Sequence, residues 1–294
     1  MISESALDRL QALFAAPDLS GTRYRLVSVL GRGGMAVVYL ARDTTLDRDV
    51  ALKVLDWTVD ESSAARLAQE ARILARLEHP GIVPVHDFGQ LADGRLFYAM
   101  KRVRGERLDR WAAGRDVYER LNAFLRVCDA VAFAHAHGVI HRDLKPENVM
   151  VGEFGEVLVL DWGIARVDGQ SERHGTLVGT PDYMAPEQLQ ADGAVDGRAD
   201  VFSLGVLLAG LGDSRKALRA IAAKAAAADP AARYASVTAL GADVARFMAG
   251  LAVDALPESL SDRVVRFARR HRVAIALVLT YLAVRLLLLS AFRI

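Results

Sequence analysis

The feature that most constrains this sequence is a charged run in its middle, His141-Arg142-Asp143-Leu144-Lys145-Pro146-Glu147-Asn148. Apolar pairs flank the run, Val139-Ile140 before it and Val149-Met150 after it. Eighteen positions after Asp143 begins a second short motif, Asp161-Trp162-Gly163, which directly follows the strand-like residues 157–160. The probability that the first run occurs by chance is very low. The second motif, at a fixed distance after it, further reduces the number of folds that fit the sequence.

Composition excludes several broad classes of protein. The 294 residues are 52% hydrophobic and 25% charged, which is enough to bury a substantial core and argues against global disorder. Lys and Arg number 37 against 36 Asp and Glu, so the formal charge of +1 argues against a chain that coats nucleic acid. A single cysteine, Cys128, permits neither an internal disulfide nor a cysteine zinc cluster, and this indicates a reducing compartment.

A glycine-rich turn and a lone lysine lie near the N-terminus. Residues 24–30 and 36–41 are strand-like and are joined by Gly31-Arg32-Gly33-Gly34-Met35, and a third strand over 49–55 carries Lys53 among apolar neighbours. Glycine lets backbone N–H groups approach a phosphate closely, and a lysine in a dry setting supplies a point charge. A simpler interpretation stays open for each feature. The glycines are also explained by the steric needs of a hairpin turn, and Lys53 by a surface lysine whose aliphatic stem lies on apolar residues while its ammonium group reaches water.

A helix is predicted over residues 61–77, ending before His79-Pro80-Gly81. Glu70 lies within it and has two interpretations. It is either an exposed helix charge beside Arg66 or Arg72, or a partner for Lys53.

A third motif follows, Gly179-Thr180-Pro181-Asp182-Tyr183-Met184-Ala185-Pro186-Glu187. In this order, the motifs resemble the bacterial eukaryotic-type (Hanks-type) serine/threonine protein kinases, over about residues 24–249. The resemblance implies an α+β, two-lobed fold with a small β-rich N-lobe over residues 24–103 and a helical C-lobe over 104–250. Residues 1–23 are expected to form an N-terminal helical extension.

The resemblance also implies an activity, ATP-dependent transfer of the γ-phosphoryl group to Ser and Thr hydroxyls of proteins. Charge develops on phosphate oxygens in this reaction, so the protein acts mainly by positioning and neutralisation. By resemblance, Asp143 accepts or orients the proton of the substrate hydroxyl, and Lys145 steadies the γ-phosphate. Lys53 contacts the α- and β-phosphates while Glu70 fixes its position.

The same resemblance implies sites for the metal and for ATP. Asn148 and Asp161 are the implied ligands of Mg²⁺, with Mn²⁺ as an alternative ion. For Met100 and Met150, simple core packing is the alternative interpretation, and only their positions relative to the motifs favour a place in the adenine pocket. The implied ATP-binding positions are Gly31, Arg32, Gly33 and Gly34 over the phosphates, Lys53, and Val38, Ala51, Met100, Val103 and Met150 around the base.

One departure from the family pattern concerns the C-lobe. Residues 199–205 resemble the buried helix whose Asp200 anchors the catalytic loop, and residues 229–234 resemble the motif whose Arg233 pairs with Glu187. Asp200 and Asp229 are only 29 positions apart, fewer than is usual in the family. We therefore expect the C-lobe to be shortened after the buried central helix, without the helix that docks substrates and regulators.

This shortening favours an alternative function, a catalytically weak, pseudokinase-like module that binds nucleotide or protein. A third class, the small-molecule phosphotransferases, shares a related active-site layout. The residues 185–187 and 179–181 argue against that class, because they form a peptide-docking ledge in protein kinases.

The C-terminal segment carries a separate signal. A basic juxtamembrane segment, residues 251–272, precedes an apolar stretch over 273–292 that is about 30 Å long as a helix. This length predicts a single transmembrane helix, although Arg285 is costly within it. The positive-inside rule then places the kinase domain in the cytoplasm, at the bacterial inner membrane. A buried or interfacial helix is the alternative.

The expected partners are Ser- and Thr-containing protein substrates, the membrane, and the protein itself. Arg142 before Asp143 resembles kinases that are switched on by phosphorylation of the activation loop. Thr176 is the favoured site of autophosphorylation, since it lies four positions before Thr180. We expect Thr180 to contact Asp143 and Lys145.

Overall fold

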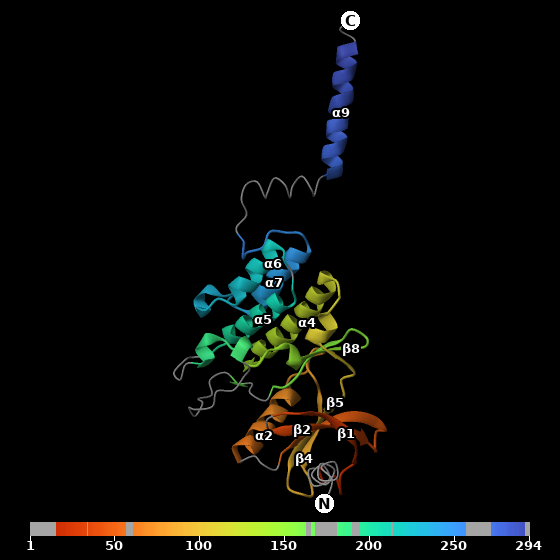
Figure 1. The fold of residues 1–294 in the computed structure, drawn as a ribbon, viewed down its shortest axis with the longest axis vertical. Coiled ribbons are helices and arrows are strands. Elements are labelled where there is room, and N and C mark those ends of the chain that lie inside the picture. Colours follow the sequence, from red (N-terminus) through yellow and green to blue (C-terminus); the bar gives the residue numbers. More distant parts are fainter. Residues whose placement is uncertain are drawn as a thin grey trace, which may run out of the picture.

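The computed structural model describes residues 16–33, 35–56, 61–162, 166–167, 181–189, 195–212, 214–256 and 272–291. These residues form a β-rich lobe and a helical lobe, as predicted, with α9 beyond the helical lobe (Figure 1). Several predictions lie outside the described residues: most of the N-terminal extension, Gly34, Gly163, and the activation-loop residues Thr176 and Thr180.

The smaller lobe is a five-stranded antiparallel sheet in the order β1-β2-β3-β5-β4. Helix α2 packs against this sheet and carries Glu70 (Figure 1). The elements are β1 (Tyr24–Arg32), β2 (Ala36–Asp43), β3 (Arg48–Leu55), α2 (Glu61–Arg76), β4 (Val85–Gln90) and β5 (Leu96–Lys101).

Strand register divides the side chains of this sheet between two faces, because successive residues of a strand point to opposite sides. Lys53 pairs with Val38 on β2 and with Tyr98 on β5, so these three residues share one face. The opposite face forms a separate apolar cluster of buried side chains, among them Tyr39, Leu52 and Phe97. The sheet thus has its own small core on one side and presents Lys53 on the other.

The larger lobe is built around helices α4 and α5. Asp116 caps the N-terminus of α4 by accepting from the amide of Tyr118, and the Glu119 side chain accepts from the amide of Asp116. The elements are β6 (Gly105–Arg107), α3 (Leu108–Ala112), α4 (Val117–Ala136), β7 (Val139–Ile140), η1 (Pro146–Asn148), β8 (Val149–Gly152), β9 (Val157–Val159), β10 (Arg166–Val167), η2 (Pro181–Tyr183), η3 (Pro186–Leu189), α5 (Arg198–Gly210), α6 (Lys216–Ala225), η4 (Pro230–Ala232) and α7 (Val237–Met248).

The short spacing between Asp200 and Asp229 is accommodated by packing α6 directly onto α5. Only residues 211–215 connect the two helices. A Cβ atom at Gly205 of α5 would lie 2.7 Å from the Ala225 Cβ and 2.7 Å from the Ala226 nitrogen. The glycine therefore permits a close approach of the two helices that any larger residue would prevent.

The apolar stretch near the C-terminus forms helix α9 (Arg272–Ala291). Several of its described side chains are exposed, with Val273 at 66%, Leu277 at 67% and Leu279 at 61%. Within the described part of the chain, none of the helices is both long and apolar enough to cross a membrane. The predicted span over residues 273–292 is therefore not supported. The helix does form, but Arg272 and Arg285 both lie within it.

Candidate active site

Lys53 lies between two carboxylates that come from different lobes. Its Nζ donates to Glu70 Oε1 and Oε2 at 2.8 and 2.9 Å, and to Asp161 Oδ1 at 2.9 Å. The Lys53 side chain is 11% exposed and the Glu70 side chain is fully buried. Glu70 is thus a partner of Lys53, and the interpretation as an exposed helix charge is wrong.

The two acids keep Lys53 charged. Burial alone lowers the pKa of a lysine, but the negative charges of Glu70 and Asp161 outweigh it and raise the pKa of Lys53 well above its usual value. A lysine in this setting is a permanent cation, placed where it can meet the phosphates of a nucleotide.

Sequence reasoning missed Tyr98 as part of this group. The Tyr98 hydroxyl donates to Glu70 Oε1 at 2.8 Å, and the whole side chain is buried. Tyr98 is therefore a positioning residue for Glu70. The signal that identifies it is strand alternation, because Tyr98 precedes Met100 by two positions and pairs directly with Lys53.

The charged run over residues 141–148 forms the loop between β7 and β8. Lys145 Nζ donates to Asp143 Oδ2 at 2.7 Å. The amide nitrogen of Asn148 donates to the Asp143 carbonyl at 2.8 Å and to Asp143 Oδ2 at 3.1 Å. The three predicted residues of this loop thus meet around a single carboxylate.

Asp200 of α5 anchors this loop through hydrogen bonds to its backbone. Its carboxylate accepts from the backbone amides of His141 and Arg142, each at 2.8 Å, and lies 2.7 Å from His135 Nε2. Arg142 has a φ of 70°, a conformation that is unfavourable for a residue with a side chain. The two hydrogen bonds from backbone amides to the Asp200 carboxylate hold the loop in this conformation, as the motif predicted. Nothing in the motifs identified His135, which comes from α4.

Asp161 and Trp162 follow β9 at the junction of the lobes. Asp161 has a φ of 57°, and burial alone would raise the pKa of its carboxyl. The charge and hydrogen bond of Lys53, with the charges of His141 and Lys145, instead lower that pKa, so the group is ionised at neutral pH. Trp162 is fully buried, and its ring centroid lies 4.5 Å from that of His141.

The residues predicted to hold the metal fit a hard cation. Because the Asn148 amide nitrogen bonds to Asp143, its oxygen is the atom left for a metal, and the Asp161 side chain is half-exposed and ionised. Among the described residues, no three His, Cys, Asp or Glu side chains group closely enough to hold a metal by themselves. A carboxylate and an amide oxygen are hard ligands, and a divalent cation on such a pair usually completes its shell with substrate phosphates and water.

The glycine-rich turn leaves room above this site. Gly31 pairs with Val38 across the hairpin, and a Cβ atom there would meet nothing within 4 Å. The Gly33 amide donates to the Ala36 carbonyl at 2.9 Å. Arg32 is exposed at the end of β1. Among the residues that the structure describes, no contact therefore requires glycine at position 31.

The predicted adenine residues come from adjoining strands. Ala51 on β3 pairs with Met100 on β5, and Val38 shares their face of the sheet. Val103 follows β5, and Met150 lies on β8 of the other lobe. Met100 and Val103 also pack against the main apolar core, so core packing accounts for part of their burial.

Arg233 joins the end of the lobe to the predicted docking ledge. Its guanidinium donates to Glu187 Oε1 and Oε2 at 2.6 and 2.7 Å, and its side chain is fully buried. The same guanidinium also donates to backbone carbonyls of Arg198, Ala227 and Ala228. The predicted ion pair thus forms despite the short connection between α5 and α6.

A five-stranded lobe with a doubly paired lysine, set on a helical lobe with an anchored acidic loop, defines the class of two-lobed phosphotransferases. The chain belongs to the protein kinase family: residues 24–241 match the model of the protein kinase domain.

Bacterial relatives agree with this assignment. The chain is 43% identical to the DNA damage-responsive serine/threonine-protein kinase RqkA of Deinococcus radiodurans, over 63% of this chain and 29% of that protein. It is 41% identical to the serine/threonine-protein kinase pkn3 of Myxococcus xanthus, over 63% and 37% of the two chains. It is 37% identical to the serine/threonine-protein kinase PknB of Mycolicibacterium smegmatis, over 84% and 46%. The chain thus spans less than half the length of each of these three relatives.

Proposed function

We propose that this protein transfers the γ-phosphoryl group of ATP to Ser and Thr hydroxyls of proteins, with a divalent cation. The observation that carries the proposal is that two clusters of charged side chains, one around Lys53 and one around Asp143, lie at the junction of the lobes. Lys53 is clamped by Glu70 and Asp161, and Asp143, Lys145 and Asn148 meet on one anchored loop. The names of the relatives, all serine/threonine-protein kinases, support the choice of acceptor.

Each side chain has a part in this reaction. Lys53 binds the α- and β-phosphates as a fixed cation, which its two carboxylate partners orient. Asp143 accepts or orients the proton of the incoming hydroxyl, and Lys145, which donates to Asp143, steadies the γ-phosphate. Asn148 and Asp161 hold Mg²⁺, or Mn²⁺ in its place, which neutralises charge on the phosphate oxygens when bound.

Transfer from radiolabelled ATP to a general Ser- and Thr-containing protein tests this function. We expect transfer that needs a divalent cation, label on phosphoserine and phosphothreonine, and loss of at least a hundredfold in rate for Asp161→Asn and for Lys53→Met. The exposed variant Asp47→Asn is the control, since the Asp47 side chain is 89% exposed and its ion-pair partner is Arg42, which is not a residue of the site. Transfer at equal rates by all four proteins would refute the proposal.

The alternative function is a kinase-shaped binding module. The short connection between α5 and α6 favours it, because the usual docking helix has no room there. The complete set of charged side chains around Lys53 and Asp143 favours the enzyme instead. ATP binding without transfer by the unsubstituted protein would support the module.

We further propose that the protein phosphorylates itself on Thr176. The support is its position four residues before Thr180 and the presence of Arg142 beside Asp143. Mass spectrometry after incubation with Mg-ATP is expected to find a phosphate on Thr176. An unmodified Thr176, in material that phosphorylates another protein, would contradict this assignment.

Finally, we propose that α9 attaches the kinase domain to the cytoplasmic face of the bacterial inner membrane. The support is its exposed apolar side chains and the arginines that precede it, which suit an anionic lipid surface. Flotation with vesicles that contain anionic lipid tests this attachment. We expect the intact protein to float and a Leu277→Glu, Leu282→Glu double variant to remain in the dense fraction. Equal flotation of both proteins would contradict the role of α9.

A further inference from the structure

The sheet of the smaller lobe has a second apolar face, on the side away from Lys53. We call it the outer face; it is the buried cluster that includes Tyr39, Leu52 and Phe97. Tyr39 is only 3% exposed and Phe97 only 5%. Helix α2 packs on the other face, where Glu70 meets Lys53. Because a sheet with two apolar faces needs a packed layer on each, the outer face needs a cover of its own.

The chain before β1 supplies a small part of this cover. Among the described residues, Leu19 is the partly buried apolar side chain that packs against the outer face, and Pro17 is buried as well. Neighbouring strands lie about 4.8 Å apart, so five strands span about 19 Å. One leucine and one proline are too small to cover a sheet of this width. The remaining cover has to come from another segment.

Residues 1–15, which lie outside the described residues, join the structure at the edge of the outer face. Arg95 is buried, and its Nη2 donates to the Ala16 carbonyl oxygen at 2.8 Å. Asp93 Oδ2 accepts from Arg95 Nε at 3.1 Å and from Nη2 at 2.8 Å, which orients the guanidinium. Leu91, in the same turn between β4 and β5, belongs to the outer face. The preceding segment therefore starts beside the surface that needs a cover.

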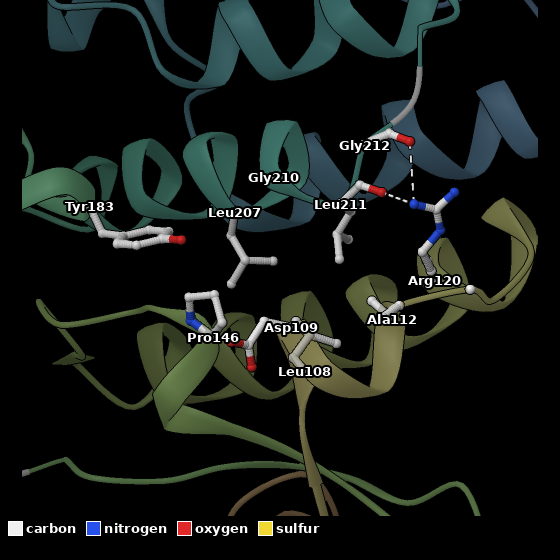
Figure 2. Close-up of a pocket in the computed structure, with 12 residues that line it drawn as sticks. Leu108, Asp109, Ala112, Arg120, Pro146, Tyr183, Leu207, Gly210, Leu211 and Gly212 are labelled. Carbon is white, nitrogen blue, oxygen red and sulfur yellow. Dashed lines mark hydrogen bonds between the residues drawn. The ribbon is translucent and has the colours of Figure 1, made fainter.

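An arginine that binds backbone carbonyls closes a helix elsewhere in this molecule. Arg120 of α4 donates to the carbonyl oxygens of Leu211 and Gly212, at the C-terminal end of α5 (Figure 2). The last carbonyls of a helix lack partners within it and favour a nearby cation. The bond from Arg95 to Ala16 matches this arrangement, and the proline directly after Ala16 is typical of a helix end.

The sequence before Ala16 has the pattern of an amphipathic helix. At 3.6 residues per turn, one side of this helix is apolar and the opposite side, which includes Asp8 and Ala12, is not. A helix of 15 residues is about 22 Å long, close to the width of the sheet. The positions on the apolar side are Ile2, Ala6, Leu7, Leu10, Leu13 and Phe14.

We propose that residues 1–15 form an amphipathic helix that packs on the outer face of the smaller lobe, opposite α2. Docking within one molecule is favoured over docking between two copies, because the anchor at Ala16 keeps the segment at a high effective concentration. The sheet that carries Lys53 then lies between two helices. The folded unit of this kinase therefore begins before residue 24, where the match to the family model starts.

Hydrogen–deuterium exchange of the full chain tests this docking without any nucleotide, and so independently of the proposed function. An isolated helix of this length is marginal in water, so it protects its amides only when it is docked. We expect the amides of residues 1–15 to exchange at least about tenfold more slowly than those of a free peptide with the same sequence.

Leu10→Glu is the test variant, and Ala12→Glu is its matched control. Leu10 lies in the middle of the apolar side and Ala12 on the opposite side, and each substitution introduces one carboxylate. In Leu10→Glu we expect residues 1–15 to exchange as fast as the free peptide, because the carboxylate would have to enter an apolar contact. In Ala12→Glu they should stay protected. Slow exchange of the β2 and β3 amides in both variants shows that the sheet is still folded.

Three results would overturn the proposal. The first is exchange of residues 1–15 at the free-peptide rate in the unsubstituted protein, a measurement that decides even if Leu10→Glu does not fold. The second is equal protection of the segment in Leu10→Glu and Ala12→Glu. The third is protection that is lost on dilution while size-exclusion chromatography shows a dimer dissociating, which would assign the segment to the outer face of a second copy.

Discussion

Lys53, its carboxylate partners Glu70 and Asp161, and Tyr98 form a group that we call the lysine clamp. Tyr98 and Glu70 are its least exposed members. The Tyr98 hydroxyl bonds to a carboxylate that Lys53 also uses, and both side chains lie inside the protein. A hydrogen bond to a charged buried group contributes more to stability than one between neutral groups. The clamp therefore contributes to the stability of the fold as well as to the placing of Lys53.

Tyr98→Phe tests this double role. The substitution keeps the ring and removes the bond to Glu70, so we expect the free energy of unfolding to fall by about 1–2 kcal/mol. Urea denaturation measures the change. Tyr118→Phe is the control, since the Tyr118 side chain is 45% exposed and should change stability by less than about 0.5 kcal/mol. Equal effects of the two substitutions would show that the bond to Glu70 contributes nothing.

Asp200 predicts a dependence of stability on pH. Burial alone would raise the pKa of Asp200, but the hydrogen bond and charge of His135, the charge of His141 and the amide of Arg142 together lower it. A carboxyl whose pKa is lowered on folding adds stability above its unfolded pKa of about 3.9, and this stability is lost as pH falls through the lower folded value.

Asp200→Asn is accordingly expected to cost about 2–4 kcal/mol of unfolding free energy at pH 7, because it disturbs three buried hydrogen bonds. The difference from the unsubstituted protein should shrink as the pH falls below about 4. Chemical denaturation at a series of pH values gives both curves. A difference that is constant down to pH 2 would contradict the assigned pKa direction.

At this scale the motifs predicted the residues that contact the reactants better than those that support them. Lys53, Asp143 and Asp161 lie in short runs whose order is specific. Tyr98 and His135 act through contacts with residues 28 and 65 positions away, and no local pattern records such contacts.

At the scale of the elements, the close packing of α5 against α6 is the distinctive feature of the helical lobe. Gly205 brings the helices together, whereas Gly210 on the same helix faces open space. The two glycines therefore have opposite costs of substitution.

Gly205→Ala should destabilise the protein by about 1–3 kcal/mol, because the added methyl group overlaps α6. Gly210→Ala should be neutral or stabilise by up to about 1 kcal/mol, through the higher helix propensity of alanine. Thermal or urea unfolding of the two variants checks the difference in sign. Equal changes in stability would show that α6 does not pack on α5 as described.

In the smaller lobe, residue patterns predicted β1, β2, β3 and α2, whereas β4 and β5 were not predicted. The predicted strand over 49–55 and helix over 61–77 correspond to Arg48–Leu55 and Glu61–Arg76. The direct contact of α5 with α6 was not predictable, because spacing alone shows that residues are missing and not how the remaining helices close the space.

In the whole molecule, one apolar core joins the two lobes. It includes Leu67 and Leu74 of α2, Trp162 at the junction, and Leu204 of α5. The charged clamp around Lys53 lies beside this core, so the same packing that stabilises the protein also sets the distance between the two halves of the site. The described side chains of helix α9, among them Leu277 and Leu279, are exposed and do not belong to this core.

The central claim, that the two halves of the site act together as a phosphotransferase, is tested most directly on Asp143. Nucleotide affinity and the rate of phosphoryl transfer are measured side by side for the unsubstituted protein and for Asp143→Asn. Asparagine keeps the shape of the side chain but cannot accept the hydroxyl proton. We therefore predict equal affinity for Mg-ATP within about twofold, and a transfer rate at least a hundredfold lower in the variant. Tight binding of Mg-ATP by both proteins, with the unsubstituted protein transferring phosphate no faster than Asp143→Asn, would contradict the account.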